Sequence, residues 1–272
     1  MGGVSSLRVL IALVACALCA APSRASDLDA LRALALEKSA AISLFKAKGA
    51  GQLARLAQDR VFAAYLNAST QGEGVRLRAR MAAMFANVSS RFGLHDIVLV
   101  DRSGELVVRT GATSGSTAPL DMKRDPVLVA GFAQAPTTAA MIVGRDGFTF
   151  AAPVVWREQK EFVLSARQDA AAYRAIMARG APKGAFLVLV DAKGHVLADT
   201  RGAQPGKLIA GLSLDAMRKA VKGKPGEGSG EVARGKDRFN ISYRSDGAWT
   251  VIAAKPATLP HRCPNEGTRL CG

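Results

Sequence analysis

A repeated segment constrains the fold of this chain more than any other feature. The apolar run Ile97–Asp101 leads to Gly104 and a second apolar run, and about 90 residues later Phe186–Asp191 leads to Gly194 and a second apolar run. Each copy predicts a β-hairpin, because an Asp-x-x-Gly turn supplies a side chain that accepts backbone hydrogen bonds and a glycine that takes positive φ. Two copies indicate two modules of one architecture in tandem.

The segment before the first repeat is predicted to be helical. From residue 27 to residue 91, apolar residues recur every three or four positions, as one buried helix face requires. Gly49 and Gly51 weaken this pattern. We therefore expect a first helix up to these glycines, a second over about 52–67, and a third over about 75–92 that Gly93 ends.

Strands dominate the rest of the chain. The first module is expected to contain the hairpin after residue 96, a helix over 126–133 capped by Asp125, a strand at 141–143, a second hairpin over 148–167 and a helix over 169–177. A Gly- and Pro-containing linker at 180–184 separates it from the second module. There we expect a hairpin over 186–198, a helix over 214–221, a Gly-rich turn over 223–230 and three strands near 230–233, 238–243 and 249–253. The fold class is therefore α+β, with antiparallel strands gathered in two small sheets.

The N-terminus has the pattern of an export signal. Arg8 precedes the apolar stretch Val9–Ala21, and small residues follow at the spacing that signal peptidase recognises. Since this stretch is shorter than the ~20 residues of a membrane span, we interpret residues 1–25 as a cleaved signal peptide and expect a periplasmic protein. A lipoprotein with lipidated Cys16 and an uncleaved anchor are the alternatives.

The C-terminal residues 257–272 are expected to form an unstructured tail. Two of the four cysteines, Cys263 and Cys271, lie in this tail. In an oxidising compartment they could form a disulfide, and two unpaired thiols are the alternative.

The formal net charge of +15 restricts the kinds of partner. The basic residues are dispersed, which is typical of a solvated surface, although attraction to anionic lipid headgroups or to an anionic ligand is also consistent with it. Aromatic residues make up only 6% of the chain and no nucleic-acid-binding motif occurs, so nucleic acid is not an expected partner.

The residues expected of a catalytic site are missing from the sequence. The three histidines are isolated, without metal-ligand spacing. Ser43 and Lys46 match Ser-x-x-Lys but lack the companion motifs of penicillin-binding enzymes, and the glycines of 226–230 precede a strand instead of opening a helix. Asp101 and Asp191 are interpreted as turn residues and Trp249 as a core residue. We therefore expect neither enzymatic activity nor a cofactor or metal.

The order of these elements resembles the double Cache sensor region of bacterial chemoreceptors, sensor histidine kinases and diguanylate cyclases. The resemblance covers residues 27–255 and is most specific at the two Asp-x-x-Gly hairpins and at Gly247-Ala248-Trp249 before the last strand. It implies a long N-terminal helical region (26–95) beside two PAS-like modules (96–180 and 185–256). No apolar run after Pro256 resembles the family's second transmembrane helix, so we expect a free-standing exported domain or a truncated receptor.

The resemblance implies that a small molecule binds in the first module. Among its polar and aromatic residues the candidates for this site are Arg167, Arg109, Asp121, Arg124, Arg145, Phe148 and Trp156. Arg167 lies near the position where amine-binding members of the family carry an acid, so a carboxylate or another anion is the expected ligand. The Arg-x-Trp-Tyr unit of the amino-acid-binding members does not occur.

A sensor of this type requires an output partner. We expect a membrane signalling partner, in chemotaxis or a related pathway, and a homodimer is possible. The alternatives from the sequence are a free-standing periplasmic solute-binding protein and a basic protein that binds envelope lipid or polymer.

Overall fold

The computed structural model describes residues 23–110, 125–144, 147–202, 213–234 and 237–257. Most of the expected signal peptide and nearly all of the expected tail, with Cys263 and Cys271, lie outside these ranges. Ser23, which we assigned to the signal peptide, is the first residue of helix α2.

Two five-stranded antiparallel sheets form the framework of the described residues, as the repeat predicts. The first has the order β2-β1-β5-β4-β3 and the second the order β7-β6-β10-β9-β8, so the two sheets share one topology. The strands of the first sheet are β1 (Leu94–Asp101), β2 (Leu106–Arg109), β3 (Ala140–Gly144), β4 (Gly147–Trp156) and β5 (Gln159–Asp169). Those of the second are β6 (Phe186–Asp191), β7 (Val196–Asp199), β8 (Glu227–Arg234), β9 (Asp237–Ser245) and β10 (Trp249–Pro256). We call each sheet with the helices packed on it the first and the second module.

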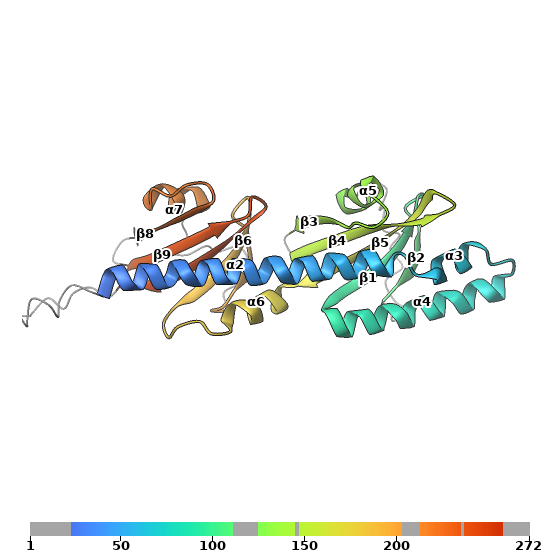
Figure 1. The fold of residues 1–272 in the computed structure, drawn as a ribbon, viewed down its shortest axis with the longest axis horizontal. Helices are drawn as coiled ribbons and strands as arrows, with labels where there is room; N and C mark the ends of the chain where they lie inside the picture. The colour runs from blue at the N-terminus through green and yellow to red at the C-terminus, as the bar shows by residue number, and fades with distance from the viewer. Residues whose placement is uncertain (1–22, 111–124, 145–146, 203–212, 235–236, 258–272) are drawn as a thin grey trace, which may run out of the picture.

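Helix α2 (Ser23–Leu56) runs alongside both modules and packs against both sheets (Figure 1). The expectation that the helix ends near Gly49 and Gly51 is therefore wrong. The break lies at residues 57–59, where the Asp59 side chain accepts a hydrogen bond from the backbone N–H of Val61 and caps helix α3 (Arg60–Leu66). Gly49 lies close to Gln168 and Phe150 of the first sheet, a tertiary contact that local propensity does not report.

The third predicted helix is confirmed as α4 (Gln71–Phe92). The Thr70 hydroxyl caps its N-terminus by accepting from the N–H of Glu73, and Gly93 ends it with φ of +62°. Such a left-handed residue is the common helix terminator because it lacks the Cβ that makes positive φ costly.

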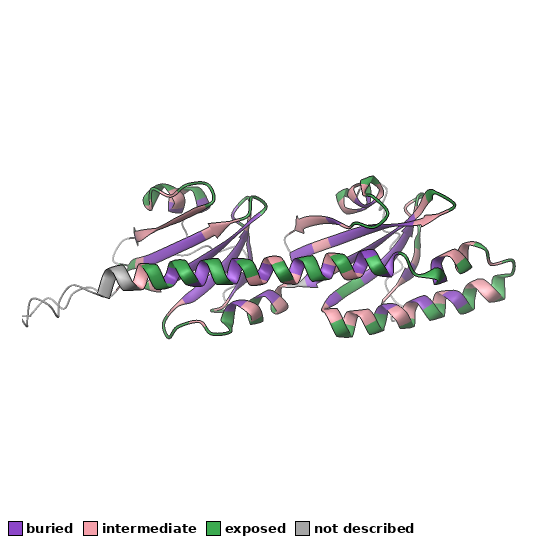
Figure 2. Cartoon of the chain, viewed as in Figure 1, coloured by how far each residue is buried: buried purple, intermediate pink, exposed green. Residues whose placement is uncertain are grey.

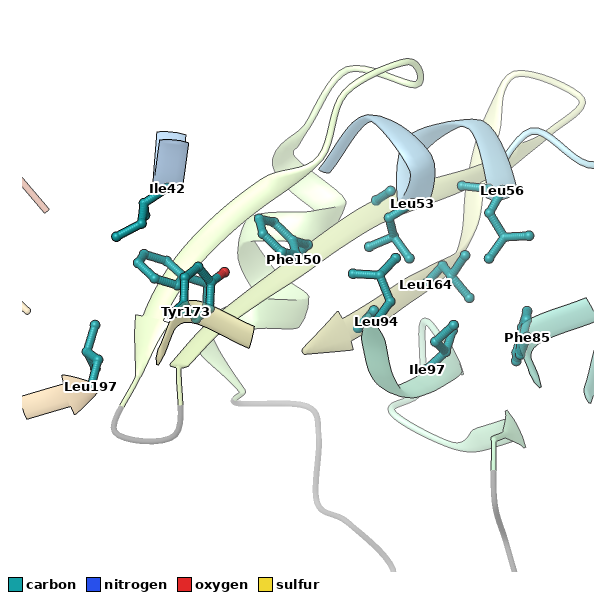
Figure 3. Close-up of a cluster of buried hydrophobic side chains, with 14 of the residues drawn as sticks. Ile42, Leu53, Leu56, Phe85, Leu94, Ile97, Phe150, Leu164, Tyr173 and Leu197 are labelled. Carbon is teal, nitrogen blue, oxygen red and sulfur yellow. The ribbon is translucent and has the colours of Figure 1, made fainter. Parts of the chain in front are cut away.

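Each sheet is covered on both faces. Helices α5 (Pro126–Ala133) and α7 (Leu214–Ala220) lie on one side, and α2, α4 and α6 (Ala170–Ala178) lie on the other (Figure 1). The buried positions follow the inner face of α2 and the strands behind it (Figure 2). Figure 3 shows this core, in which Leu53 and Leu56 of α2 meet Leu94, Ile97 and Leu164 of the first sheet.

The turn interpretation of the two repeated aspartates is confirmed. The carboxylate of Asp101 accepts from the N–H of Glu105, and that of Asp191 accepts from the N–H groups of Lys193 and His195. Partial burial acts to raise the pKa of Asp191, but the hydrogen bonds from His195 and the backbone outweigh it and lower the pKa below 3.8. The turn is therefore set by local hydrogen bonds that the sequence can specify.

Two local predictions need correction. The glycines of 223–230 do not form one turn, because β8 begins at Glu227 and pairs with β9. Glycine is tolerated in β8 because Gly228 lies close to the ring of Tyr243 in β9, as described below. In addition, Asp169 belongs to the end of β5, and α6 starts at Ala170.

Candidate functional site

The alternation of β5 assigns its side chains to two different environments. Phe162, Leu164 and Ala166 belong to the core under α2, whereas Val163 packs with Leu128 of α5. Since successive side chains of a strand point to opposite faces, Arg167 lies on the face that carries α5. This is the face of the first sheet that the long helix leaves uncovered.

Two predicted arginines meet on this face at a carboxylate. Nη2 of Arg167 lies 2.6 Å from Oδ2 of Asp96, and Nη2 of Arg109 lies 3.8 Å from Oδ1 of the same carboxylate. Arg167 and Asp96 are 40% and 45% exposed, so both reach solvent. We call these three residues the Asp96 cluster; it holds two guanidiniums and one carboxylate.

A β-bulge places Asp96 in this position. The register between β1 and β5 shifts between His95 and Val98, and Asp96 has φ of +49°. Aspartate is one of the few residues that visit this left-handed region at low cost. Sequence reasoning missed Asp96. The signal that could have found it is an aspartate directly before a run of apolar residues, where a bulge in the strand can turn the side chain toward the neighbouring strands.

Helix α5 packs closely on the same face. An added Cβ at Gly131 would lie 2.7 Å from Cγ1 of Val163 and 2.9 Å from Cβ of Ala151, so only glycine fits. Lys160 also ties the helix to the sheet, because its Nζ donates to the carbonyl of Phe132 at 2.7 Å. Arg167 lies four residues along β5 from Val163, about 13 Å away at 3.3 Å per residue. Helix α5 and Asp96 therefore both contact residues of β5.

The other predicted site residues do not join this cluster. Phe148 is fully buried on the opposite face of the sheet, where its ring lies 4.8 Å from that of Tyr173, so the idea that it lines the same pocket as Arg167 is wrong. The cause is strand parity, since Phe148 pairs with Gln168 and not with Arg167. Trp156 lies at the far end of β4 with Arg157 over its ring at 4.0 Å. Asp121, Arg124 and Arg145 lie outside the described residues.

A buried lysine links the two modules. Nζ of Lys46 in α2 lies 5.0 Å from the ring centre of Phe148 in β4 and 4.5 Å from that of Trp249 in β10, and the carboxylate of Asp246 is 3.9 Å away. Burial lowers the pKa of Lys46 below 10.5, and the charge of Asp246 opposes this only in part. The Ser-x-x-Lys pattern therefore reflects a structural lysine held by cation–π contacts. The expectation that Trp249 is a core residue is confirmed.

A buried amide lies directly behind the Asp96 cluster. Gln168 follows Arg167 in the chain but points to the α2 face, where it is fully buried. Its Nε2 donates to the carbonyl of Phe45 in α2 at 3.4 Å, and its Oε1 accepts from the hydroxyl of Tyr173 in α6. Burial raises the pKa of this tyrosine, which stays a neutral donor. Strand β5 thus carries the candidate site on one face and a contact to two helices on the other.

The described residues also line pockets outside this cluster. One of about 620 Å³ lies between the modules, lined by Met141–Gly144 of β3 and by the turn that holds Asp191 and His195. Another, of about 500 Å³, lies on the second module between α2 and β9. Within the described ranges, no group of three or more metal-ligating side chains comes together. Over the same ranges, no helix has both the length and the apolar character needed to cross a membrane.

Comparison with known proteins gives similarity in structure only. No protein-family model and no curated protein matches the sequence. The structure is similar to the sensor domain of the Vibrio cholerae histidine kinase DctB, with a TM-score of 0.63 at 15% identity over 86% of this chain and 98% of that one. It is also similar to the ligand-binding domain of the Campylobacter jejuni chemoreceptor Tlp3 in complex with L-valine, with a TM-score of 0.65 at 12% identity over 85% of this chain and 93% of that one.

These similarities agree with the architecture described above. Both solved domains are matched over nearly their whole length. The fold expected from the sequence is therefore confirmed: the chain shares the fold of these two solved domains.

Proposed function

We propose that this chain is an exported, non-enzymatic sensing domain that binds a small carboxylate at the Asp96 cluster and signals through a membrane partner. The observation that carries this proposal is the convergence of Arg109 and Arg167 on one face of the first sheet. A guanidinium binds a carboxylate through paired N–H donors, so two arginines on one face favour an anion. The similar structures are sensor domains, one of them solved with L-valine, which supports ligand sensing.

The role of Asp96 distinguishes two kinds of carboxylate ligand. Its carboxylate repels a dicarboxylate but can accept hydrogen bonds from the ammonium group of an amino acid. Replacing it with asparagine removes this charge. Asp96→Asn should therefore tighten the binding of a dicarboxylate, or weaken the binding of an amino acid.

Strand β5 offers a physical route from the site to the long helix. A ligand that shifts Arg167 acts on Gln168, whose amide contacts α2 and α6. Helix α2 also carries Lys46, which contacts aromatic rings of both modules. A small change in the first module can in this way alter the packing of the second, which is the kind of two-state packing change that switches use.

The test is a thermal-stability panel of monocarboxylates, dicarboxylates and amino acids on the purified chain. A ligand at 100 times its Kd adds about 2.7 kcal/mol, which raises Tm by roughly 5–10 °C for a domain of this size. Arg167→Gln should abolish the shift. Arg174→Gln is the matched control, because Arg174 is an exposed residue of α6 and its replacement changes the net charge equally.

Two results would contradict the proposal. One is a chain that melts cooperatively but shows no shift in Tm with any ligand of the panel. If its binding to anionic vesicles also falls steeply with salt, the envelope-binding alternative is favoured. The other is equal loss of the shift in Arg167→Gln and Arg174→Gln. Tight binding without a signalling partner would favour a free-standing solute-binding protein.

A further inference from the structure

The pocket of about 500 Å³ on the second module has the character of an anion site. It is lined by residues of β8, of the N-terminal half of α2 and of the turn that joins α7 to β8. The side chains that matter for the argument are Arg32 and Leu36 of α2, Lys222 and Lys224 of the turn, and Ser242 and Arg244 of β9.

Positive charge dominates the lining. Glu227 is the one acidic residue among the lining residues, and it pairs with Arg32 at 3.4 Å and with Nη1 of Arg244 at 2.5 Å. Lys222 and Lys224 are exposed, and no acidic side chain of the described residues forms a salt bridge with either. Four cationic side chains against one carboxylate leave a net charge of three positive around the pocket.

The floor of the pocket is fixed before any ligand arrives. The ring of Tyr243 lies between Gly223 and Gly228: an added Cβ would lie 2.3 Å from the Tyr243 hydroxyl at the first and 2.7 Å from its Cε1 at the second. The tyrosine hydroxyl also donates to the carbonyl of Lys224. Both glycines are thus required for the close approach of the turn to β8 and β9, and this packing holds the two lysines at the rim.

The remaining walls offer hydroxyls and an apolar surface. The hydroxyls of Ser229 and Ser242 lie 2.9 Å apart, and Leu36 is 55% exposed at the side of α2. We propose that this pocket binds the phosphate group of a small phosphate ester. A phosphate carries about two negative charges at neutral pH and several acceptor oxygens, which match the arginines, lysines and hydroxyls, while the aliphatic part of the ester contacts Leu36.

This inference is independent of the proposed carboxylate site. The Asp96 cluster belongs to the first module, and none of its residues lines this pocket. Phosphate chemistry can come from a soluble ester or from the headgroup of an anionic phospholipid. The experiment therefore presents both.

The experiment measures binding of the purified chain to glycerol 3-phosphate by calorimetry, and to vesicles of phosphatidylglycerol or phosphatidylcholine by sedimentation, both at 150 mM salt. The double variant Lys222→Gln/Lys224→Gln should bind at least tenfold more weakly. Lys183→Gln/Lys193→Gln is the matched control, since these two lysines are also exposed residues of the second half of the chain and lie outside the pocket. All four positions are exposed, so both double variants should melt like the parent chain.

Each outcome of this experiment either supports or overturns the proposed phosphate site. Binding of glycerol 3-phosphate that only the first double variant loses supports a soluble ester. Binding only to phosphatidylglycerol vesicles, with the same variant pattern, supports a lipid headgroup. Equal weakening in both double variants would show general charge attraction and overturn the proposal, as would the absence of binding to either probe.

Discussion

The glycines of α2 provide a sharp test of the packing behind the Asp96 cluster, because one substitution should have opposite effects at two nearby positions. An added Cβ at Gly49 would lie 2.5 Å from Nε2 and 3.0 Å from Cδ of the buried Gln168. At Gly51 an added Cβ would meet nothing within 4 Å. Replacing glycine by alanine within a helix otherwise stabilises by up to about 1 kcal/mol.

The balance at Gly49 should favour destabilisation. Gln168 is held by Phe45 and Tyr173, so its amide cannot move away without losing its partners. Overpacking costs about 1–3 kcal/mol and a buried amide without its partner about 1–3 kcal/mol, against a gain of about 1 kcal/mol in helix propensity. Gly49→Ala should therefore lower the free energy of unfolding by about 1–5 kcal/mol, whereas Gly51→Ala should raise it by up to about 1 kcal/mol.

Urea denaturation followed by tryptophan fluorescence measures both values, with the slope m checked for constancy. Adding Gln168→Ala removes the clashing amide, so the double variant Gly49→Ala/Gln168→Ala should be more stable than the sum of the single changes predicts. Equal stability of Gly49→Ala and Gly51→Ala would refute this account of the packing. Additive effects of Gly49→Ala and Gln168→Ala would refute the assigned contact.

Three further predictions concern charge and packing. Burial lowers the pKa of Lys46 in the folded chain, whereas in the unfolded chain this pKa keeps its usual value near 10.5. Between these two pKa values the unfolded state binds more protons than the folded state, so the free energy of unfolding should rise with pH in that window. Lys46→Met should remove this rise in pH-dependent urea titrations, and an unchanged profile would contradict it. Asp191 has a lowered pKa, so its contribution is present above pH 3.8 and is lost as the pH falls through its folded value; Asp191→Asn should destabilise at pH 7, with a difference that shrinks in acid. Gly131→Ala should lower stability by about 1–3 kcal/mol through the clash with Val163, partly offset by helix propensity, and an increase in Tm would be inconsistent with the close packing of α5.

Local patterns in the sequence determined the elements of the fold. The repeated Asp-x-x-Gly hairpins, the cap at Asp125 and the helix end at Gly93 depend on hydrogen bonds or backbone angles within a few residues, so their residue types predict them. The burial of Trp249 and the two antiparallel sheets follow from apolar runs bounded by turn residues. From these patterns, the α+β class and the tandem arrangement could be predicted.

Contacts between residues far apart in the chain determine which residues come together at the candidate site. Whether Phe148 or Thr149 shares a face with Arg167 depends on strand register, and a shift of one residue exchanges the two faces. The bulge that brings Asp96 to both arginines is likewise set by the pairing of β1 with β5. A glycine stands at position 49 inside the helix because Gln168, more than a hundred residues later, occupies the space that a side chain would need. Local propensity contains none of this information, since it arises only when the second strand of each pair is in place.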